Sequence, residues 1–238
     1  MQNKLEIYAE KYVNPDDGMK VDERLLEILS SRVMKYVKGP KVLEMGVGAG
    51  TYTNKIIDKF GISYVVDGSN KLLEKQKSIY KNDLVIYNSY FEEFKSDLKF
   101  DTILATNVLE HVDDPVLVLK NMKNCLNEDG EILIIVPNAN SLHRNYGKTL
   151  NIIKDLTQLG ESDFKIGHKR VYTAELLEQH IKDAGLKVKS KLPTFIKLLS
   201  NSQMNNFTDF QLEGLFLLAE RLDKFLDYDG DIFMEVVK

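Results

Sequence analysis

Three glycines and a glutamate are the first residues in this sequence whose spacing could do chemistry. Gly46, Gly48 and Gly50 occupy alternate positions, and Glu44 stands two residues ahead of the first. Glycine tolerates unusual φ values and lets a ligand lie directly against the backbone, because it has no Cβ. A helix predicted over 51–60 begins where this loop ends, and a helix N-terminus offers free N–H groups to a carboxylate. The pattern predicts a site for a nucleotide-like ligand.

A threonine after this loop and a later aspartate narrow the kind of ligand. The dinucleotide fingerprint places its third glycine where Thr51 stands, so the loop points away from NAD. Asp67 ends a strand predicted over 63–67, at the edge where open α/β sheets bind their ligands. Its carboxylate can accept hydrogen bonds from both hydroxyls of a ribose. Taken singly, the glycines also fit a plain turn, and Asp67 also fits a helix cap.

The surrounding segments alternate between strand and helix, which predicts an α/β fold. Asp114 can cap one of these helices, and Pro115 fits its first turn, where a missing N–H costs nothing. Apolar strands that alternate with helices predict a parallel sheet covered on both faces. Strands are predicted over 41–45, 63–67, 83–88, 100–106, 131–137, 186–192 and 231–237, and helices over 21–37, 51–60, 69–80, 114–126, 173–184 and 207–226.

Two motifs, KVLEMGVGAG and YVVDGSN, resemble the first two motifs of the class I S-adenosylmethionine-dependent methyltransferases. The stretch FDTILATNVLEHVDDP at 100–115 is similar to the fourth motif of that family, and the resemblance covers about residues 41–137. It implies a Rossmann-like, doubly wound sheet of seven strands, mostly parallel with the last strand antiparallel. N-terminal helices and an insertion after the fifth strand complete this expected fold.

The same resemblance implies S-adenosylmethionine as the cofactor, with S-adenosylhomocysteine as its product. Glu44 and the glycine loop would hold the methionine part, and Asp67 the ribose. The segment 88–94 takes the place of the adenine-contacting motif but lacks the aspartate common there, so its two aromatic residues are weaker candidates. The expected cofactor-binding residues are Glu44, Gly46, Val47, Gly48, Gly50, Asp67, Gly68, Ser69, Tyr90, Phe91 and Asn107.

The chain has four histidines, and three of them are candidate bases. Methyl transfer aligns an acceptor with the methyl carbon, and a hydroxyl acceptor must lose a proton. His143 and His168 fall in the irregular stretch 138–172, which we expect to cover the ligand edge of the sheet, and His111 follows the fourth strand. These three are the predicted catalytic residues, although the first two could equally order the loop. We expect His180 to lie at the surface.

Two arginines stand beside these histidines and favour an anionic acceptor. Arginine makes planar, two-pronged bonds to phosphate or carboxylate. We expect Arg144, Arg170 and Tyr172, with help from Lys169, to bind a phosphorylated or nucleotide-linked small molecule. A solvated loop is the competing interpretation. The segments PNANSLHR and GHKRVYTAELL also resemble ubiquinone-type and sugar-modifying methyltransferases, which favours small-molecule O-methylation in surface-glycan or secondary metabolism.

The chain is expected to form one methyltransferase domain over 1–238. Within it, 1–38 would be a helical lid that could use Tyr8 and Tyr12, and 138–172 would be the acceptor-binding insertion. With 43% hydrophobic and 29% charged residues, the composition is that of an ordinary globular protein.

Charge and cysteine content set the expected partners and compartment. A net charge of -4 gives no positive field for nucleic acid. The single cysteine, Cys125, is expected in the core of a protein from the reducing cytoplasm, and no metal is expected. No apolar stretch suggests a membrane span. We expect a monomer or a homodimer.

Four other functions compete with this prediction. N-methylation of a small molecule is the nearest, because the sequence does not identify the acceptor atom. A nucleic-acid or protein methyltransferase is a weaker alternative, since the segment after the fourth strand lacks the (Asn/Asp)-Pro-Pro-aromatic turn of amino-methylating enzymes. A module that binds the cofactor without turnover and an oxidoreductase remain open.

Overall fold

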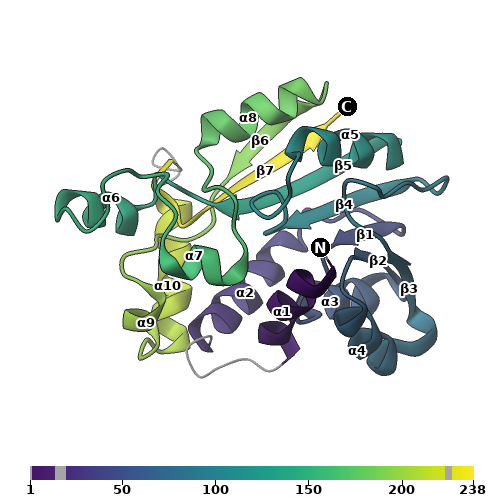
Figure 1. Ribbon diagram of the computed structural model, residues 1–238, viewed down its shortest axis with the longest axis horizontal. Helices are drawn as coiled ribbons and strands as arrows, with labels where there is room; N and C mark the ends of the chain where they lie inside the picture. The colour runs from purple at the N-terminus through teal and green to yellow at the C-terminus, as the bar shows by residue number, and fades with distance from the viewer. Residues whose placement is uncertain (1, 14–19, 223–226) are drawn as a thin grey trace.

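The computed structural model describes residues 2–13, 20–222 and 227–238, and its centre is a sheet of seven strands in the order β3-β2-β1-β4-β5-β7-β6 (Figure 1). All neighbouring strands are parallel except that β7 runs antiparallel to both β5 and β6. The predicted α/β class and antiparallel last strand are therefore confirmed. The strands are β1 (Val42–Met45), β2 (Ser63–Asp67), β3 (Leu84–Asn88), β4 (Phe100–Thr106), β5 (Leu126–Pro137), β6 (Lys187–Leu192) and β7 (Asp231–Val237).

The strand order brings the predicted ligand residues to the point where the chain reverses its direction across the sheet. From β1 the chain moves outward through β2 to β3 and then returns to β4 on the other side of β1. Such a reversal leaves an opening at the carboxyl ends of the two central strands. The glycine loop follows Met45 at the end of β1, and Asn107 follows Thr106 at the end of β4.

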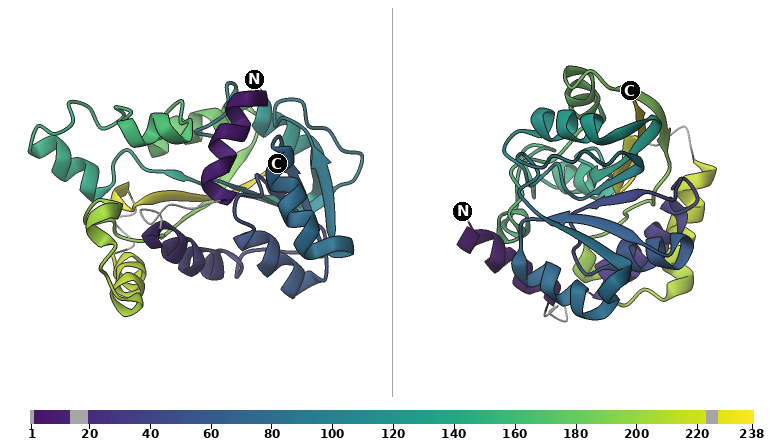
Figure 2. Two further views of the ribbon diagram at one scale, coloured as in Figure 1. Left: turned by 60° about the horizontal axis from the view of Figure 1, so that its bottom comes forward. Right: turned by 90° about the vertical axis from the view of Figure 1, so that its right-hand side faces the viewer.

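Helices cover both faces of the sheet (Figures 1 and 2). One face packs against α2 (Lys20–Val33), α3 (Thr51–Phe60) and α10 (Asp209–Arg221), and the opposite face against α5 (Pro115–Cys125) and α8 (Ala174–Asp183). The alternation of side chains along β1 explains this division: Val42 faces the first group and Leu43 the second. Buried Cys125 belongs to the second core, as predicted.

Local sequence signals set several helix ends. The Asp114 side chain accepts a hydrogen bond from the N–H of Leu117 at 2.9 Å, which confirms it as the cap of α5. Ser69 caps α4 (Asn70–Tyr80) and Thr173 caps α8. Gly185, just beyond α8, has a φ of 70°, the left-handed conformation expected of it.

The insertion over 138–172 contains two helices that the sequence did not predict, α6 (Leu142–Thr149) and α7 (Glu161–Ile166). Its ends are held together, since Asn138 forms a parallel bridge with Tyr172 and the N–H of Ala139 donates to the Tyr172 carbonyl at 2.7 Å. In Figure 1, α6 projects beyond the end of the sheet.

Four further elements differ from prediction. Strand β5 begins at Leu126 rather than at 131, because the segment before Gly130 continues along the edge of β4. The predicted helix 207–226 is shorter, since α10 ends at Arg221 and 223–226 lie outside the described residues. The sequence analysis gave no bounds for two further helices, α1 (Gln2–Val13) and α9 (Asn201–Met204). Among the described residues, no helix combines the length and hydropathy needed to cross a bilayer.

Candidate active site

The glycine loop adopts backbone conformations that only glycine takes without strain. Gly46, Gly48 and Gly50 have φ values of 79°, 49° and 89°. The N–H of Gly46 donates to the Val66 carbonyl at 2.8 Å, which fixes the loop to β2. A Cβ at Gly50 would also lie 2.5 Å from Oε1 of buried Gln76. The loop requires its glycines, as the sequence predicted.

Glu44 is buried directly before this loop. Its side chain accepts a hydrogen bond from the Thr53 hydroxyl at 2.5 Å, and the residue is only 2% exposed. Burial raises the pKa of Glu44 to about 8, with a smaller contribution from the charge of Asp67. A cationic group on a ligand would reverse this effect. A buried carboxyl group at the loop therefore fits the ammonium group of a methionine moiety.

Two more buried polar side chains near the loop have no hydrogen-bond partner among the described residues. They are the hydroxyl of Tyr52 and the amide of Gln76. Buried polar groups are normally paired, so unpaired ones mark places where a ligand or an ordered water completes the network. Burial and the nearby Glu44 also raise the pKa of Tyr52, which stays protonated as a hydrogen-bond donor.

Asp67 connects β2 to the glycine loop. Its Oδ2 accepts the N–H of Val47 at 3.0 Å and its Oδ1 accepts the N–H of Ser69 at 2.8 Å. Burial raises the pKa of Asp67, and these backbone donors oppose the increase. The carboxylate and the loop are thus held as one unit, in the positions expected for the ribose and methionine ends of one ligand. Asp67 is no helix cap here, because Ser69 caps α4.

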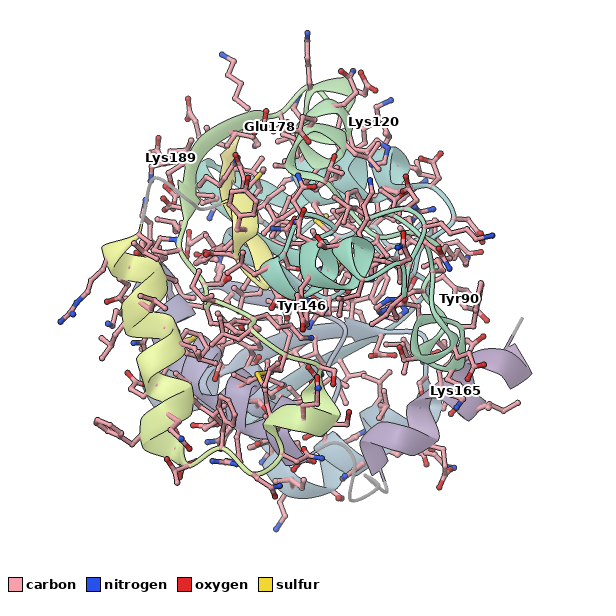
Figure 3. The ribbon with its side chains drawn as sticks, turned by 90° about the vertical axis from the view of Figure 1, so that its left-hand side faces the viewer. Tyr90, Lys120, Tyr146, Lys165, Glu178 and Lys189 are labelled. Atoms are coloured by element: carbon pink, nitrogen blue, oxygen red, sulfur yellow. The ribbon has the colours of Figure 1, made fainter. Side chains whose placement is uncertain are left out.

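The aromatic residues predicted near the adenine flank the same loop. The ring of Tyr90 would lie 3.3 Å from a Cβ at Gly68, and the ring of Phe91 would lie 3.5 Å from a Cβ at Gly46. Both side chains are half-buried. Figure 3 shows Tyr90 and Lys165 of α7 at the same edge of the molecule. Their placement is compatible with packing on a base, and that role stays a prediction.

Helix α1 covers this edge of the site through residues that the sequence did not single out. The Glu6 carboxylate accepts hydrogen bonds from the Ser69 hydroxyl and the Asn70 N–H, both at 2.9 Å. Leu5 packs over Gly68, where a Cβ would be 2.7 Å from its Cδ2. The sequence did not predict that the Glu6 carboxylate lies at the N-terminus of α4, because Glu6 and Ser69 are far apart in the chain.

Tyr8 extends the cover toward the insertion. Its ring lies 2.7 Å from the position of a Cβ at Gly167, at the end of α7, so α1 spans from α4 to the insertion. The role of 1–38 as a lid stays a prediction. The side chain of Tyr12, the other residue predicted for the lid, lies outside the described residues.

Asn107 occupies the end of β4 as expected. Its φ of 54° is left-handed, its N–H donates to the Ile135 carbonyl at 2.8 Å, and its side chain is exposed. A non-glycine residue in this conformation costs energy and often occurs at functional sites. The next residue, Val108, packs near Gly46. This contact brings the segment 107–114 after β4, here called the β4 loop, against the glycine loop.

Two of the predicted catalytic histidines lie together. The rings of His111 and His168 are 4.7 Å apart at their centroids and nearly perpendicular. Nε2 of His168 lies 4.0 Å from Oε1 of Glu110, and its Nδ1 lies 3.0 Å from Oδ1 of Asp163. Burial, with a smaller contribution from His168, lowers the pKa of His111 to about 4, so that ring is neutral at physiological pH.

The third predicted base, His143, lies elsewhere in the insertion. Its Nδ1 is 3.0 Å from the Ser141 hydroxyl, and its N–H donates to the Lys197 carbonyl at 3.1 Å. Burial lowers its pKa to about 3, with further contributions from the charges of Lys197 and Arg144. The three predicted bases therefore form two separate groups.

His180 is not the surface residue that the sequence suggested. It is half-buried, its Nδ1 lies 3.2 Å from the Tyr172 hydroxyl, and the two rings meet edge to face. Charged neighbours in the sequence concealed this, because His180 points from α8 toward the core.

Tyr172 is misassigned as an acceptor-binding residue. It is 0% exposed, belongs to the core beneath α5 and α8, and uses its hydroxyl for the Leu109 carbonyl and His180. No surface of this side chain is available to a substrate.

The two arginines bind the protein's own backbone. Arg170 donates to the carbonyls of Leu109 and Val112 through Nη1, at 2.7 and 2.6 Å, and to that of Asp113. Arg144 donates to the carbonyls of Leu156 and Gln158. These contacts order the insertion and attach it to the β4 loop. They give both guanidinium groups a structural role that the sequence could not reveal, and anion binding by them stays a prediction.

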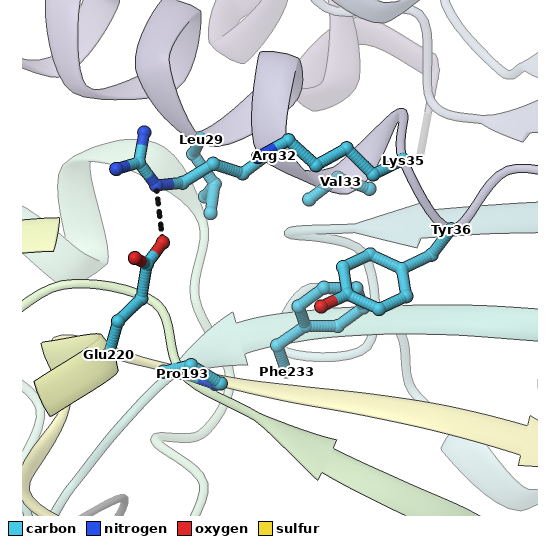
Figure 4. A pocket seen from close by; sticks show the side chains of 8 residues that line it. All are labelled: Leu29, Arg32, Val33, Lys35, Tyr36, Pro193, Glu220 and Phe233. Carbon is cyan, nitrogen blue, oxygen red and sulfur yellow. Dashed lines mark hydrogen bonds and ion pairs between the residues drawn. The ribbon is translucent and has the colours of Figure 1, made fainter. Parts of the chain in front are cut away.

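A cavity of about 120 Å³ lies apart from these residues, between α2 and the strand β7 (Figure 4). Leu29, Val33, Tyr36 and Phe233 form its apolar wall, and an ion pair of 3.3 Å between Arg32 and Glu220 crosses its rim. None of the glycine-loop residues lines it. We assign it to packing between α2 and the sheet.

Comparison with known proteins agrees with this geometry. Residues 20–191 match the model of a family described as a methyltransferase domain. The chain belongs to this methyltransferase family. S-adenosylmethionine is the cofactor of such domains, and the buried Glu44, the strained glycine loop and Asp67 fit its charged and hydroxyl groups.

Two curated relatives and one solved structure illustrate the similarity. The chain is 26% identical over 142 residues to the ubiquinone biosynthesis O-methyltransferase of Coxiella burnetii, which covers 56% of this chain and 59% of the relative. It is 25% identical over 131 residues to N-methyltransferase 4 of Papaver somniferum, which covers 51% and 37%. The chain thus spans less than two thirds of these relatives.

The structural likeness is more extensive. The S-adenosylmethionine-dependent methyltransferase of Thermotoga maritima superimposes with a TM-score of 0.65 over 98% of this chain and 99% of that chain, at 16% identity. At this identity the superposition establishes the fold. One relative carries an N-methyltransferase name and the other an O-methyltransferase name, so the acceptor atom is a separate question.

Proposed function

We propose that this methyltransferase transfers the methyl group of S-adenosylmethionine to a hydroxyl of a small, anionic metabolite. The observation that carries the proposal is the link between the glycine loop and Asp67 through the Val47 N–H, at 3.0 Å. This hydrogen bond supports the proposal because it fixes Asp67, expected at the ribose, relative to the loop expected at the methionine end of the cofactor. A phosphorylated or nucleotide-linked acceptor, as in glycan or secondary metabolism, is the class that the charges favour.

The acceptor would bind between the β4 loop and the insertion 138–172. Positive charge on this side comes from Lys197 and Arg144, both of which lower the pKa of His143. The proposed anion would lie within their field. Burial lowers the pKa of Lys197, and the charges of Asp231 and Asp22 oppose this decrease. This proposal leaves out Tyr172, which is buried, and adds Lys197, which the sequence did not single out. Anion binding by Arg170 stays a prediction.

In the transfer, a lone pair of the acceptor oxygen forms the new bond to the methyl carbon. The carbon–sulfur bond breaks, its electron pair stays on sulfur, and S-adenosylhomocysteine is released. The hydroxyl proton must leave as well. His143 is unprotonated at physiological pH and can accept it, although a histidine of such low pKa needs a hydroxyl that is readily deprotonated.

Calorimetric titration with S-adenosylmethionine and S-adenosylhomocysteine tests the first half of the proposal. Micromolar binding that is lost in Gly48→Arg and in Asp67→Ala supports it, and the absence of binding by the native chain would overturn it. A pure binding module would bind equally well but show no methyl turnover with any acceptor.

Pairs of neutral and phosphorylated acceptors test the second half. We expect Lys197→Met to raise KM for the phosphorylated acceptor about tenfold, the effect of roughly 1.4 kcal/mol, and to leave the neutral one unchanged. Equal effects on both would remove the anionic acceptor from the proposal. Mass spectrometry of the product identifies the methylated atom, and a methylated amine would favour the N-methyltransferase alternative.

A further inference from the structure

A buried carboxyl group, that of Glu110, lies beside the site. Glu110 is 0% exposed, and neither carboxylate oxygen has a hydrogen-bond partner among the described residues. Leaving such a group buried and unpaired is costly. Its main chain is anchored, because the Glu110 carbonyl accepts the N–H of Lys169 at 2.8 Å. The main chain of Glu110 is therefore fixed, and among the described residues no hydrogen-bond donor pairs with its carboxyl oxygens.

Two imidazole rings face this carboxylate from different parts of the chain. His111 is its neighbour in the β4 loop, and His168 comes from the insertion. One ligand atom from each of the three residues lies within 4.8 Å of the other two. Ligands at about 2.1 Å from a common ion are closer together than this, so movements of about 1 Å would bring the three atoms around one ion.

Each histidine has one ring nitrogen already engaged, which leaves the other for a ligand bond. Nδ1 of His168 is 3.0 Å from Oδ1 of Asp163, and Oδ2 of Asp163 accepts the N–H of Gly160 at 2.7 Å. His111 makes its bond with the backbone of Gly167. A carboxylate or carbonyl behind each imidazole is the usual support of metal-binding histidines, because it fixes the ring and its tautomer.

We propose that Glu110, His111 and His168 bind one divalent transition-metal ion. Two imidazoles and a carboxylate, with no sulfur, suit Zn²⁺, Mn²⁺, Co²⁺ or Fe²⁺ better than Ca²⁺ or a thiolate-seeking ion. Three protein ligands leave coordination positions open. The expectation of no metal considered cysteine spacing alone, and these ligands come from segments far apart in sequence.

The position of the ion gives it a role that rests on the proposed function. Glu110 and His111 follow Asn107 in the β4 loop, and His168 belongs to the insertion proposed to hold the acceptor. An acceptor hydroxyl at an open position of the ion would lose its proton more readily, since a divalent ion stabilises the oxygen anion.

Titration of the full chain with Co²⁺ after treatment with EDTA tests the site without any acceptor. We expect one Co²⁺ per chain with visible d–d absorption in the native protein. His168→Ala and Glu110→Gln should abolish the absorption. Asp163→Asn removes only the support of His168 and should weaken binding about 10- to 100-fold. His180→Ala is the matched control, since it removes an imidazole outside the cluster and should leave Co²⁺ binding unchanged.

Native protein that shows no Co²⁺ absorption, or absorption that survives in a folded His168→Ala variant, overturns the metal site. Thermal unfolding of each variant separates loss of the ligand from loss of the fold. Calorimetry with S-adenosylhomocysteine on the same samples distinguishes the two proposals. Cofactor binding without Co²⁺ binding removes only the metal site, whereas Co²⁺ binding without cofactor binding removes the proposed function and leaves the metal site intact.

Discussion

The two halves of the site are built in different ways. On the β1–β2 side, the cofactor residues are held mainly by backbone geometry, through left-handed glycines and the bond from the Val47 N–H to Asp67. On the insertion side, candidate residues depend on side-chain contacts between distant segments, such as Arg170 with the β4 loop. A site made by backbone conformation leaves a readable sequence pattern, and a site made by long-range side-chain contacts does not.

The sharpest test of this contrast compares two glycines with similar conformations. Gly50 and Gly61 have φ values of 89° and 79°, but only at Gly50 would a Cβ meet a buried neighbour, Gln76. We expect Gly50→Ala to weaken S-adenosylmethionine binding at least ~10-fold and to destabilise the fold by about 1–3 kcal/mol. Gly61→Ala should cost about 1 kcal/mol of stability and leave cofactor affinity unchanged. Calorimetry measures the cofactor affinity of each variant, and thermal unfolding measures its stability. Equal cofactor affinities for Gly50→Ala and Gly61→Ala would contradict the role of the loop.

Replacing Arg170 tests whether the insertion depends on side-chain contacts. Arg170→Ala removes three hydrogen bonds to carbonyls, so we expect a loss of roughly 1–3 kcal/mol in the free energy of unfolding. The side chain of the adjacent Lys169 makes an exposed ion pair with Asp113, and Lys169→Ala should change stability by less than about 1 kcal/mol. Chemical denaturation measures this difference. A wild-type stability for Arg170→Ala, combined with a raised KM, would restore the arginine to the acceptor site.

Proton release on cofactor binding tests the electrostatics of Glu44 on the β1–β2 side of the site. The folded-state pKa of Glu44 is raised to about 8, so at pH 7 the free protein holds a proton there. An incoming ammonium group favours the carboxylate, and binding should release on the order of one proton. Calorimetry in two buffers of different ionisation enthalpy counts it. Glu44→Gln should release none, and equal release by both proteins would assign the proton to another group.

The sign of this pKa shift also fixes a pH dependence of stability. A carboxyl group whose folded pKa lies above its unfolded value favours the folded state most below the unfolded pKa, and this contribution is lost as pH rises through the folded pKa. For Glu44 the window runs from 4.5 to about 8. As pH rises through that range, the free energy of unfolding of the native protein should therefore fall relative to that of Glu44→Gln. Chemical denaturation at several pH values measures this difference.

The smallest expected effect concerns Tyr172. Tyr172→Phe removes one hydroxyl shared with His180 and the Leu109 carbonyl, and we expect a loss of about 1 kcal/mol in stability. The KM of the Tyr172→Phe variant for any acceptor should equal that of the native enzyme, because the ring is buried. A clear rise in KM without a change in unfolding would contradict this placement.

The sequence was sufficient for most of the fold and for the positions of the predicted cofactor residues at the ends of β1 and β2. The strands 63–67, 100–106 and 231–237 were predicted to the residue, since apolar β-rich runs between turn residues leave little ambiguity. The positions of Glu44 and Asp67 followed from the same local order. The antiparallel last strand came from the family resemblance, and the strand order, with β7 between β5 and β6, was not predicted.

The insertion resisted prediction for a physical reason. Its two arginines look like anion ligands in the sequence, but their bonds go to carbonyls whose positions depend on how 138–172 folds. Glu110 gave no signal because its neighbour His168 is distant in the chain. The predictions for His180 and Tyr172 were both wrong, because their polar atoms pair with each other and so allow both side chains to lie in the interior.

The place of β7 has a consequence for synthesis of the protein. This strand is the last in the chain order, yet it lies inside the sheet and is the neighbour that joins β6 to β5. During translation, β1 to β5 can pair as they emerge, whereas β6 must wait until Val237 has left the ribosome. Until then β5 presents an open, strongly apolar edge, which is the kind of edge that pairs with other chains. The nascent chain is most exposed to aggregation, and to chaperones, in the interval between the appearance of β5 and that of β7.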